Sequence, residues 1–249
     1  MTGALGTPRL HLRRTGSTND RARALAGAGA PHGTLVTAHE QTAGRGRQGR
    51  TWTAPPGRAL LMSVVVRDPP PLLPLVAGAA VADAVGPAAA VKWPNDVLVD
   101  GRKVAGILAE GRPAEGWAIV GIGLNVALRP EDFPPELADR AGTLGREPGA
   151  VEPALATVLA ALARWLAEPA AGLLATIRDR DALLGQPVVW AGGSGIGGGI
   201  DGSGRLVVRL PGGGTTALEA GEVHLGGAPG GQSSGAASDS RPDGGSSGG

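Results

Sequence analysis

The sequence predicts an α/β (α+β) fold followed by a small all-β module, and three observations indicate this. Apolar segments of helix length and of strand length follow one another through residues 1–180. From about residue 181 the pattern changes to short strands at close spacing, which is typical of a small barrel or roll. The last stretch, 226–249, is rich in glycine and serine, lacks large apolar side chains and is predicted to be a disordered tail.

Three helices are predicted in the first part. One covers 16–30, where Ser17 or Thr18 caps the N-terminus and glycines end the run. A second covers 72–85. The third covers 152–168, has a proline near its start, and carries an apolar face formed by Leu155, Val158, Leu159, Leu162 and Leu166.

The strands of the first part are predicted at 34–38, 58–68 and 117–126. A hairpin is expected over 91–111, because Asp100-Gly101 is a strong signal for a type I′ turn. The β module is expected to contain five short strands: "PVVWA" (187–191), "GGGID" (197–201), "RLVVRL" (205–210), "TTALEA" (215–220) and "EVHL" (222–225).

Composition excludes several classes of function. The net charge is +1, so no global field recruits nucleic acid or a membrane, and any basic site is local. There is no cysteine, which excludes disulfides and thiolate chemistry. The N-terminus lacks an apolar signal region and no run approaches the length of a membrane span, so a soluble, cytoplasmic protein is expected. The four histidines show no metal-ligand spacing: His11, His32, His39 and His224.

The segment "GRGRQGRT" (44–51) fits the letter pattern of a phosphate-binding loop, with arginine in place of lysine. Such a loop needs a helix after it, and the following Pro55-Pro56-Gly57 cannot carry one. A nucleic-acid site is also a poor fit, because no known RNA- or DNA-binding motif surrounds the segment. A mobile, solvated basic loop remains the plain alternative.

A third interpretation fits the chemistry better. The guanidinium groups of Arg45, Arg47 and Arg50 can surround one compact anion, since each offers a fork of donors suited to carboxylate or phosphate. A carboxylate that attacks the α-phosphate of ATP is repelled by it. The repulsion is about 4 kcal/mol at 4 Å and an effective dielectric constant of 20, and nearby guanidinium groups would offset it. Trp52 follows directly, either as a core residue or as a surface on which a purine stacks.

A second group of polar residues lies in "KWPNDVLVDGRK", which contains Lys92, Asn95, Asp96 and Lys103. A two-residue turn at Asp100-Gly101 pairs Leu98 with Lys103, Asp96 with Ala105 and Asn95 with Gly106. Strand alternation then places Lys103, Ala105 and Asp96 on one face. The group is either an exposed ion pair of small energetic value or a lysine held for an anionic ligand, with Gly106 allowing that ligand close to the backbone.

The later segment "GIGLNV" (121–126) places two glycines in a buried strand before Asn125, whose amide donates and accepts hydrogen bonds. By itself such a strand is more often a packing feature than a site.

Taken together and in order, five segments resemble the biotin protein ligases: "GSTND" (16–20), "EQTAGRGRQGRTW" (40–52), "KWPNDV" (92–97), "GRKVAGILAE" (101–110) and "GIGLNV" (121–126). The resemblance extends over most of 9–225. It implies a biotin/lipoate-ligase-like catalytic domain with a mixed sheet over 1–180, and a small SH3-like barrel over 181–225, before the tail at 226–249.

The resemblance also implies an activity. Such an enzyme converts biotin and ATP into biotinyl-5′-AMP and pyrophosphate with Mg²⁺. It then transfers biotin to one lysine of the biotin carboxyl carrier domain of an acetyl-CoA or acyl-CoA carboxylase, as a monomer or a homodimer.

Residue roles follow from the same resemblance. Lys103 and Arg47 are the implied catalytic residues. The implied biotin-binding residues are Ser17, Thr18, Asn19, Gln41, Arg45, Gly46, Arg47, Lys103 and Gly106. The implied ATP- and adenylate-binding residues are Arg45, Arg47, Arg50, Trp52, Asn95, Asp96, Lys103 and Asn125. No direct metal motif is present, and Mg²⁺ is expected to arrive on ATP, with Asp96 as a candidate ligand.

Three alternatives remain. A lipoate or octanoate ligase would share the architecture but lack the polar Ser-Thr-Asn cluster. A non-catalytic biotin or nucleotide sensor is disfavoured by intact Lys103 and the three arginines. A glycine-rich RNA-binding protein would extend its basic residues beyond one loop. Only 16 residues precede Ser17, too few for a helix-turn-helix domain, so no sequence-specific DNA binding is expected.

Overall fold

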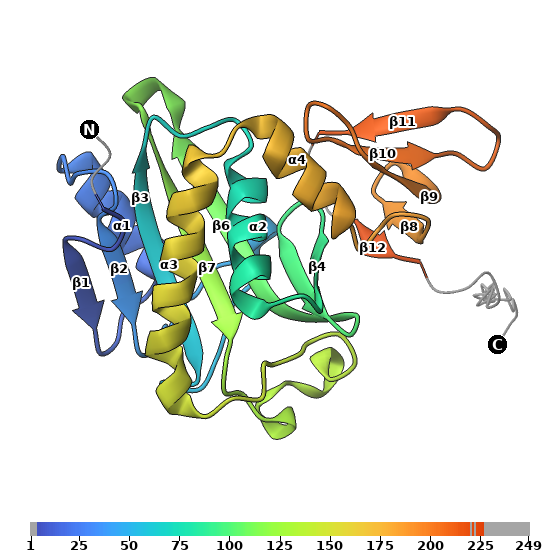
Figure 1. Cartoon of the computed structure of the whole chain (residues 1–249). Coiled ribbons are helices and arrows are strands. Elements are labelled where there is room, and N and C mark those ends of the chain that lie inside the picture. Colours follow the sequence, from blue (N-terminus) through green and yellow to red (C-terminus); the bar gives the residue numbers. More distant parts are fainter. Residues whose placement is uncertain (1–3, 220, 222, 227–249) are drawn as a thin grey trace, which may run out of the picture.

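The computed structural model describes residues 4–219, 221 and 223–226, and in these residues two β-sheets are present (Figure 1). The predicted tail lies, apart from Gly226, outside the described residues. The larger sheet belongs to the first part of the chain and the smaller sheet to its C-terminal part.

The larger sheet is mixed and has seven strands in the order β1-β2-β3-β7-β6-β5-β4. The β1–β2 pair is parallel and the other pairs are antiparallel. The strands are β1 (Arg9–Leu12), β2 (Leu35–Ala38), β3 (Ala59–Arg67), β4 (Ala89–Lys92), β5 (Asp96–Val99), β6 (Arg102–Arg112) and β7 (Trp117–Asn125). The central strands β3 and β7 are long and almost wholly buried because both faces of the sheet are covered.

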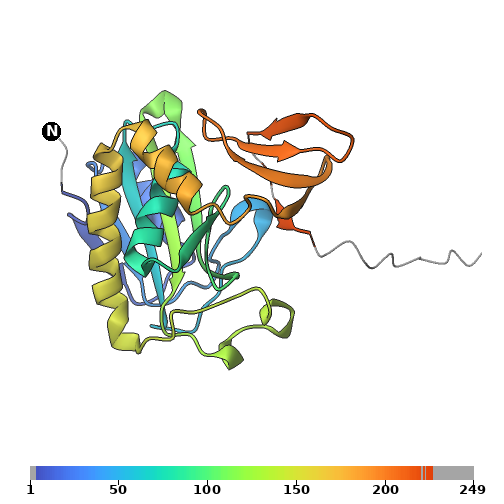
Figure 2. The same cartoon turned by 45° about the vertical axis from the view of Figure 1, so that its right-hand side comes forward.

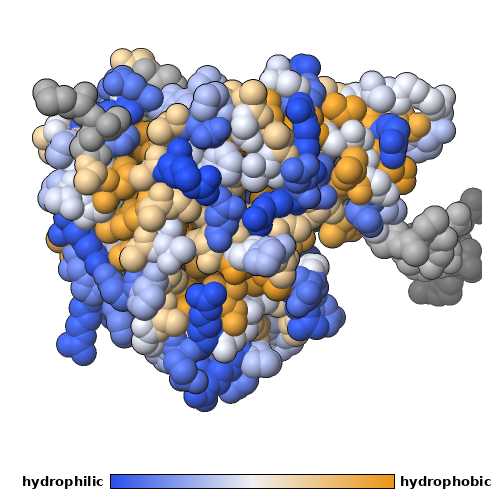
Figure 3. Space-filling model, viewed as in Figure 1, coloured by the Kyte–Doolittle hydropathy of each residue, from blue (hydrophilic) through white to orange (hydrophobic). Residues whose placement is uncertain are grey.

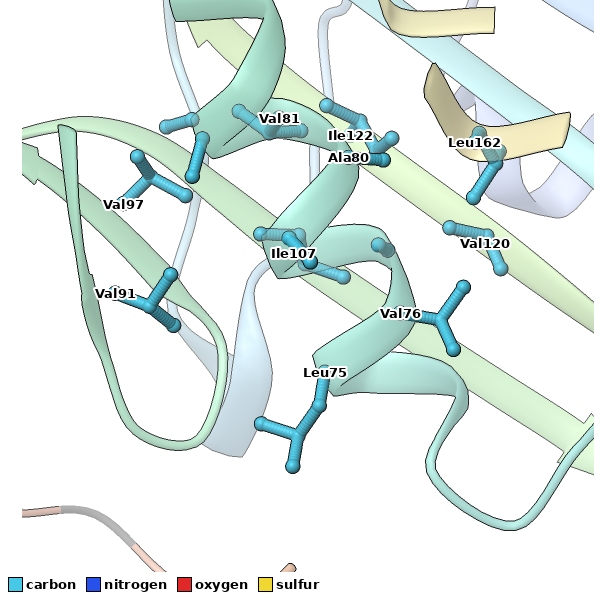
Figure 4. Packing of buried hydrophobic residues seen from close by; sticks show 14 of the residues in the cluster. Leu75, Val76, Ala80, Val81, Val91, Val97, Ile107, Val120, Ile122 and Leu162 are labelled. Carbon is cyan, nitrogen blue, oxygen red and sulfur yellow. The ribbon is translucent and has the colours of Figure 1, made fainter. Parts of the chain in front are cut away.

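Helices cover the two faces of this sheet unequally, as Figure 1 shows. One face carries α1 (Thr18–Gly27), and the other carries α2 (Leu73–Val85), α3 (Val151–Ala167) and α4 (Ala170–Asp179). Strand alternation divides the core accordingly: Val64 joins the cluster under α2 and α3, and Val65 joins the cluster under α1. Figure 4 shows α2 directing Val76 and Val81 toward Ile107 of β6 and Val120 of β7.

Five short 3₁₀ segments interrupt the connections. They are η1 (Arg47–Gly49), η2 (Pro113–Glu115), η3 (Pro130–Asp132), η4 (Pro135–Leu137) and η5 (Pro148–Ala150). The last four begin with proline, which cannot donate the first backbone hydrogen bond but fits the first position of a helical turn.

The smaller sheet is antiparallel, in the order β11-β10-β9-β8-β12. Its strands are β8 (Pro187–Trp190), β9 (Gly193–Ile200), β10 (Leu206–Arg209), β11 (Thr215–Leu218) and β12 (His224–Leu225). Buried side chains of β9 and β10 belong to the same apolar cluster as α2. The indole Nε1 of Trp93 also donates to the Gly204 carbonyl at 3.0 Å, and Arg178 Nε donates to the Ile200 carbonyl at 2.7 Å. The two sheets therefore share one core.

The predicted elements are confirmed with small shifts in their ends, including all five strands of the C-terminal part. The predicted apolar face of α3 is confirmed too, with Leu155, Val158 and Leu162 buried and the other two leucines half-buried. The elements β1, β4 and α4 were not predicted.

The predicted register of the β5–β6 hairpin is wrong beyond Leu98. The turn has positive φ at both Asp100 and Gly101, as expected, and Leu98 pairs with Lys103. A β-bulge then shifts the register, so Val97 pairs with Ala105 and Asp96 with Gly106. Ala105 consequently turns into the core instead of sharing a face with Lys103.

One helical segment, Pro148–Ala167, is long and apolar enough to cross a membrane by length and composition, unlike the sequence expectation. In the structure α3 instead packs its buried side, which includes Val158 and Leu162, against α2 and β3. Figure 3 shows apolar and polar residues interleaved over this face of the molecule, without a continuous apolar belt. One face of this helix therefore belongs to the core of the fold.

Candidate functional site

Three glycines lie close together on the α1 face of the larger sheet. Strand pairing aligns Ser63, Gly121 and Leu108 in one row across β3, β7 and β6. The next row contains Gly123 and Gly106 side by side. Because three of these positions carry no side chain, other groups can lie directly against the backbone of the sheet here.

The first feature on this glycine floor is a small cavity. The N-terminal turn of α1 supplies polar walls, and the chain after β2 and the glycine rows supply the rest. Its lining includes Ser17, Thr18, Asn19, Gln41, Arg45, Trp52, Gly106, Leu108, Gly121 and Gly123. We call this space the ring cavity. Most of its polar wall atoms are uncharged amides and hydroxyls.

Buried hydrogen bonds fix the polar walls of the ring cavity. Gln41 Oε1 accepts from the Thr18 backbone N–H at 2.7 Å. Asn19 Nδ2 donates to Glu110 Oε2 at 2.8 Å. Ser63, which is fully buried under these residues, lies 2.8 Å from Thr18 Oγ1 and 2.6 Å from Asn19 Oδ1. Ser17 is the N-cap of α1, yet its side chain makes no capping hydrogen bond, so its hydroxyl is available to a ligand.

The segment 44–51, which contains three arginines, forms a compact loop at the mouth of the ring cavity. We call it the arginine loop. Gly46 N–H donates to the Arg50 carbonyl at 2.7 Å, and Trp52 N–H donates to the Gly44 carbonyl at 2.9 Å. Positive φ at Gln48 and Gly49 makes the tip. No α-helix follows the loop, as the prolines predicted, so the phosphate-loop interpretation is wrong. The surface beside the loop includes Gly46, which does not line the ring cavity itself.

Arg45 is held at the cavity mouth by carboxylates. Its guanidinium donates to both oxygens of Glu110, at 2.7 and 2.8 Å, and lies 3.1 Å from Asp20. Arg23 makes a second ion pair with Glu110 at 2.6 Å. Glu110 thus joins the arginine loop, α1 and the amide of Asn19 in one network.

Trp52 lies directly on the glycine floor and lines both the ring cavity and the larger groove beside it. A Cβ added to Gly123 would stand 2.4 Å from its indole ring, and one added to Gly106 would stand 3.0 Å from it. The indole Nε1 is buried and has no acceptor among the described residues. The two glycines are therefore required by the position of this side chain.

The second space is a larger, open groove, which we call the cationic groove. It runs between the arginine loop, the β5–β6 hairpin, the 3₁₀ region before α3 and the end of the smaller sheet (Figure 2). Its basic lining residues are Arg47, Arg50, Lys92, Lys103 and Arg140, and its amides are Asn95 and Asn125.

Lys103 and Asp96 face each other across the hairpin. Lys103 Nζ lies 2.6 Å from Asp96 Oδ1 and 5.6 Å from the centre of the Trp52 ring. The contact is electrostatic, because the buried Oδ1 accepts no well-directed hydrogen bond from the described residues. The bulge in β6 produces this geometry by turning Lys103 to the same side as Gly106. Lysine therefore stands where the ring cavity opens into the groove.

Two asparagines complete the groove. Asn95 Oδ1 accepts from Arg47 at 3.0 Å, and its Nδ2 donates to the Ile107 carbonyl at 2.9 Å. Asn125 is buried at the end of β7 and donates to the Gly142 carbonyl at 2.8 Å. Asn95 therefore positions Arg47, and Asn125 ties β7 to the chain before α3.

The described residues contain no group of three or more His, Asp or Glu side chains placed to hold a metal ion. Asp96 is the carboxylate beside Lys103, and it is already engaged by that ammonium. This donor set fits Mg²⁺ that arrives coordinated to nucleotide phosphates with one protein carboxylate at most, which is a common mode for this ion.

The structure thus brings the sequence candidates together in two adjoining spaces. Sequence reasoning missed Ser63 and Glu110, and gave little weight to Gly121 and Gly123. Ser63 is a single hydroxyl inside an apolar strand, and only its register opposite Gly121 shows what it contacts. Glu110 lies at the end of a predicted strand, and its neighbours in the sequence do not indicate a role for it.

The chain is similar to known proteins in both sequence and structure. The model of the biotin/lipoate A/B protein ligase family matches residues 12–126. The biotin–[acetyl-CoA-carboxylase] ligase of Paracoccus denitrificans is 40% identical over 241 residues, covering 87% of this chain and 100% of that protein. The corresponding ligase of Mycobacterium tuberculosis is 39% identical over 236 residues, covering 85% and 87%.

A bifunctional ligase/repressor of Bacillus subtilis is 43% identical over 145 residues, and the chain spans only 45% of that protein's length. Among solved structures, a biotin protein ligase from Aquifex aeolicus in complex with biotin and ATP superposes with a TM-score of 0.76 at 28% identity. That match covers 88% of this chain and 100% of the other. A biotin protein ligase from Leishmania major in complex with biotinyl-5-AMP gives a TM-score of 0.57 at 26% identity, covering 86% and 99%.

Proposed function

The chain belongs to the biotin protein ligases, and from this we propose that it activates biotin with ATP and transfers it to a lysine of a carrier protein. One observation carries the proposal: a ring cavity with mainly uncharged polar walls opens directly into a cationic groove, and Lys103 stands at the junction. A molecule with a neutral polar ring and an anionic end fits these two spaces in one orientation only.

The ring cavity suits the cyclic urea of biotin. This group has two N–H donors and one carbonyl acceptor and carries no charge, so a buried site must supply hydrogen bonds without net charge. Ser17, Thr18, Asn19 and Gln41 supply hydroxyl and amide groups, all in the wall of the cavity. The acyl chains of lipoate and octanoate offer no partner for the hydrogen-bonding capacity that these groups have left, and each group buried without a partner costs about 1–3 kcal/mol.

The cationic groove suits the carboxylate and the nucleotide. Bringing two anions to 4 Å costs about 4 kcal/mol at an effective dielectric constant of 20. Lys103 and Arg47 offset this repulsion at the reacting carboxylate and α-phosphate, and Arg50 extends the positive charge along the phosphates. Trp52 offers the nearest aromatic face for the adenine, and Asn125 lines the same groove.

The first step joins the substrates. A carboxylate oxygen of biotin attacks the α-phosphorus of ATP, the bond to the bridging oxygen breaks, and pyrophosphate leaves with both bonding electrons. Lys103 and Arg47 hold the two reactants in line and stabilise the charge that builds on the phosphoryl oxygens. No protein nucleophile takes part.

The second step transfers the acyl group. The amine of the carrier lysine attacks the acyl carbon of biotinyl-5′-AMP, AMP leaves with the bonding electrons, and the amine loses one proton. In the first step Mg²⁺ bound to the triphosphate would neutralise phosphate charge, and Asp96, which lines the groove, would be the carboxylate that shares in holding it. The other residues named here bind, orient and exclude water.

The C-terminal strands have a place in this proposal. We infer that residues 181–225 form an SH3-like barrel beside a catalytic unit of residues 1–180, because five short antiparallel strands make up the smaller sheet. Its last strand reaches the groove, where His224 and Leu225 contribute to the lining. The carrier domain of an acetyl-CoA or acyl-CoA carboxylase would present its lysine at this open side.

Radiolabelled biotin, ATP and Mg²⁺ incubated with the protein and a biotin carboxyl carrier domain test the proposal. The expected result is label on the carrier and release of pyrophosphate. Transfer of lipoate or octanoate with no transfer of biotin would overturn it in favour of the acyl-chain ligases. Binding of biotin without pyrophosphate release would indicate a sensor.

A further inference from the structure

We propose that Ser63 and Glu110, neither of which lines the ring cavity, fix the direction of its hydrogen bonds and so determine its selectivity for a cyclic urea. Ser63 is fully buried beneath α1 on β3, and Glu110 lies on β6. Both act through Thr18 and Asn19 and are therefore positioning residues. The inference rests on the proposed function and adds residues that recognise the ring indirectly.

The orientation of the Asn19 amide is set first. One end of the amide lies 2.8 Å from Glu110 Oε2 and 3.3 Å from the Leu108 carbonyl oxygen. A carboxylate and a carbonyl only accept hydrogen bonds, so this end must be the NH₂ group. The oxygen of Asn19 is consequently the atom that faces Ser63.

The hydroxyl of Ser63 is set next. It lies 2.6 Å from Asn19 Oδ1, which accepts but cannot donate. A hydroxyl has one hydrogen, so Ser63 gives it to Asn19. The 2.8 Å approach of Thr18 Oγ1 to Ser63 is then favourable only when Thr18 is the donor.

The hydroxyl of Thr18 also has a single hydrogen to donate. Its oxygen also lies 3.0 Å from Gln41 Oε1, which accepts the Thr18 backbone N–H at 2.7 Å and can accept a second hydrogen, so the hydroxyl hydrogen goes to Ser63 or to Gln41. Further along, Ser63 donates to Asn19, and Asn19 donates to Glu110. The hydrogen-bonding capacity that Thr18 Oγ1 and Asn19 Oδ1 have left is acceptor capacity.

These acceptors match the two N–H donors of a cyclic urea, which flank its carbonyl. Ser17, whose hydroxyl makes no capping bond, remains as a donor for a carbonyl. Without Glu110 the NH₂ group of Asn19 keeps only the longer bond to the Leu108 carbonyl, and without Ser63 the oxygen of the same amide loses its donor, so in both variants the amide turns over more easily. In either case the walls no longer present a fixed set of acceptors, and an N–H donor of the ligand meets another donor in part of the population.

Three variants test the inference, and two of them have a matched control elsewhere in the fold. Ser63→Ala is compared with Thr34→Val, which removes another buried hydroxyl that donates to the Pro31 carbonyl at 2.8 Å. Glu110→Gln is compared with Glu152→Gln, which neutralises a carboxylate paired with Arg9 outside both spaces. Ser63→Cys retains a weak donor at the same position.

The measurements are the Kd of biotin and of biotin methyl ester by titration calorimetry, and the rate of adenylate formation at saturating biotin. The ester keeps the ring but lacks the carboxylate, so it removes any contribution of Arg45 to an anionic group. We expect Ser63→Ala to weaken both ligands at least tenfold, Glu110→Gln at least fivefold, and Ser63→Cys by an intermediate factor. Saturated rates should stay within twofold, and the controls should bind like the wild type.

Unchanged binding in both Ser63→Ala and Glu110→Gln, with an active wild type, would overturn the inference and leave the proposed function intact. A wild type that neither binds biotin nor forms the adenylate would overturn both. A loss in Thr34→Val equal to that in Ser63→Ala would show a general stability effect and would also overturn it. If Ser63→Ala fails to fold, Glu110→Gln, which is close in shape to the native residue, decides the question.

Discussion

The ring cavity and the cationic groove share one floor but use opposite means of recognition. In the cavity, polar groups are buried and bonded mainly to one another, through Ser63 and Glu110. In the groove, Lys103 and the arginines line an open space, and the chain around them is largely loop and strand end. The ring cavity recognises a ligand by the direction of hydrogen bonds, and the cationic groove recognises it by charge.

This difference has a physical basis. A hydrogen bond weakens steeply when its angle is wrong, so a site that depends on direction must be rigid and buried. A charge acts over several ångströms in all directions, so a site that depends on charge tolerates movement of its side chains. Substitutions in the cavity should therefore change ligand affinity, and substitutions in the groove should change the reaction rate.

The largest expected effect is that of Lys103→Ala on the groove. Loss of the cation between carboxylate and α-phosphate should slow adenylate formation about 100-fold, or about 2.7 kcal/mol. Pyrophosphate release in a single-turnover assay measures this. Arg102→Ala, at the exposed neighbouring residue, is the control. A loss smaller than threefold in Lys103→Ala would show that the groove does not act through this charge.

Gly121→Ala should impair ligand binding in the ring cavity and leave the cationic groove unaffected. The new Cβ would stand 2.1 Å from Asn19 Oδ1, so the side chain that Ser63 and Glu110 orient must move. We expect the KM for biotin to rise about 30-fold, about 2 kcal/mol, while kcat at saturating biotin changes little. Gly149→Ala, where an added Cβ meets nothing within 4 Å, should behave like the wild type. A fall in kcat without a change in KM would contradict the division between the regions.

Arg47→Ala should give a smaller loss in the groove than Lys103→Ala. Arg47 is held by Asn95 but is one of several cations around the same space, so its neighbours supply part of the lost field. A tenfold slower adenylate formation, about 1.4 kcal/mol, is expected. Initial rates at saturating ATP and biotin test it against Arg13→Ala, an exposed arginine outside both spaces. Full activity of Arg47→Ala would remove this arginine from the site.

The smallest expected effect is that of salt, and it separates the two regions without a mutation. Raising NaCl from about 50 mM to about 500 mM shortens the screening length from roughly 14 to 4 Å. The KM for ATP should rise about threefold, while the Kd of biotin methyl ester should change by less than 1.5-fold. Equal sensitivity of both constants would mean that charge also governs the ring cavity.

Sequence reasoning predicted most elements and many of the polar residues that line the two spaces, because local signals are strong there. The Asp100-Gly101 turn has positive φ at both residues, as its composition requires. The Pro-Pro-Gly after the arginine loop excludes a helix, and none is present. These features depend on a few neighbouring residues and on backbone stereochemistry.

Features that depend on distant partners were not predictable. The bulge in β6 arises because Ala105 packs into the core under α2 while Lys103 must remain outside it, and the turn sequence contains no sign of that conflict. Ser63 looks like a minor interruption of an apolar strand until β7 places Gly121 opposite it. The strands β1 and β4 are four residues long and depend on their neighbours for stability.

The position of Trp52 has an optical consequence. The protein has five tryptophans, and three of them donate their indole N–H to fixed acceptors: Trp93 to Gly204, Trp117 to Glu115, and Trp165 to Asp83. Trp52 instead rests on two glycines, where its buried N–H has no acceptor among the described residues. The fluorescence emission of Trp52 should change when a molecule enters the ring cavity or the cationic groove. The emission of Trp93, Trp117 and Trp165 should stay constant. The intrinsic fluorescence of the unlabelled protein would then report the arrival of each substrate in real time.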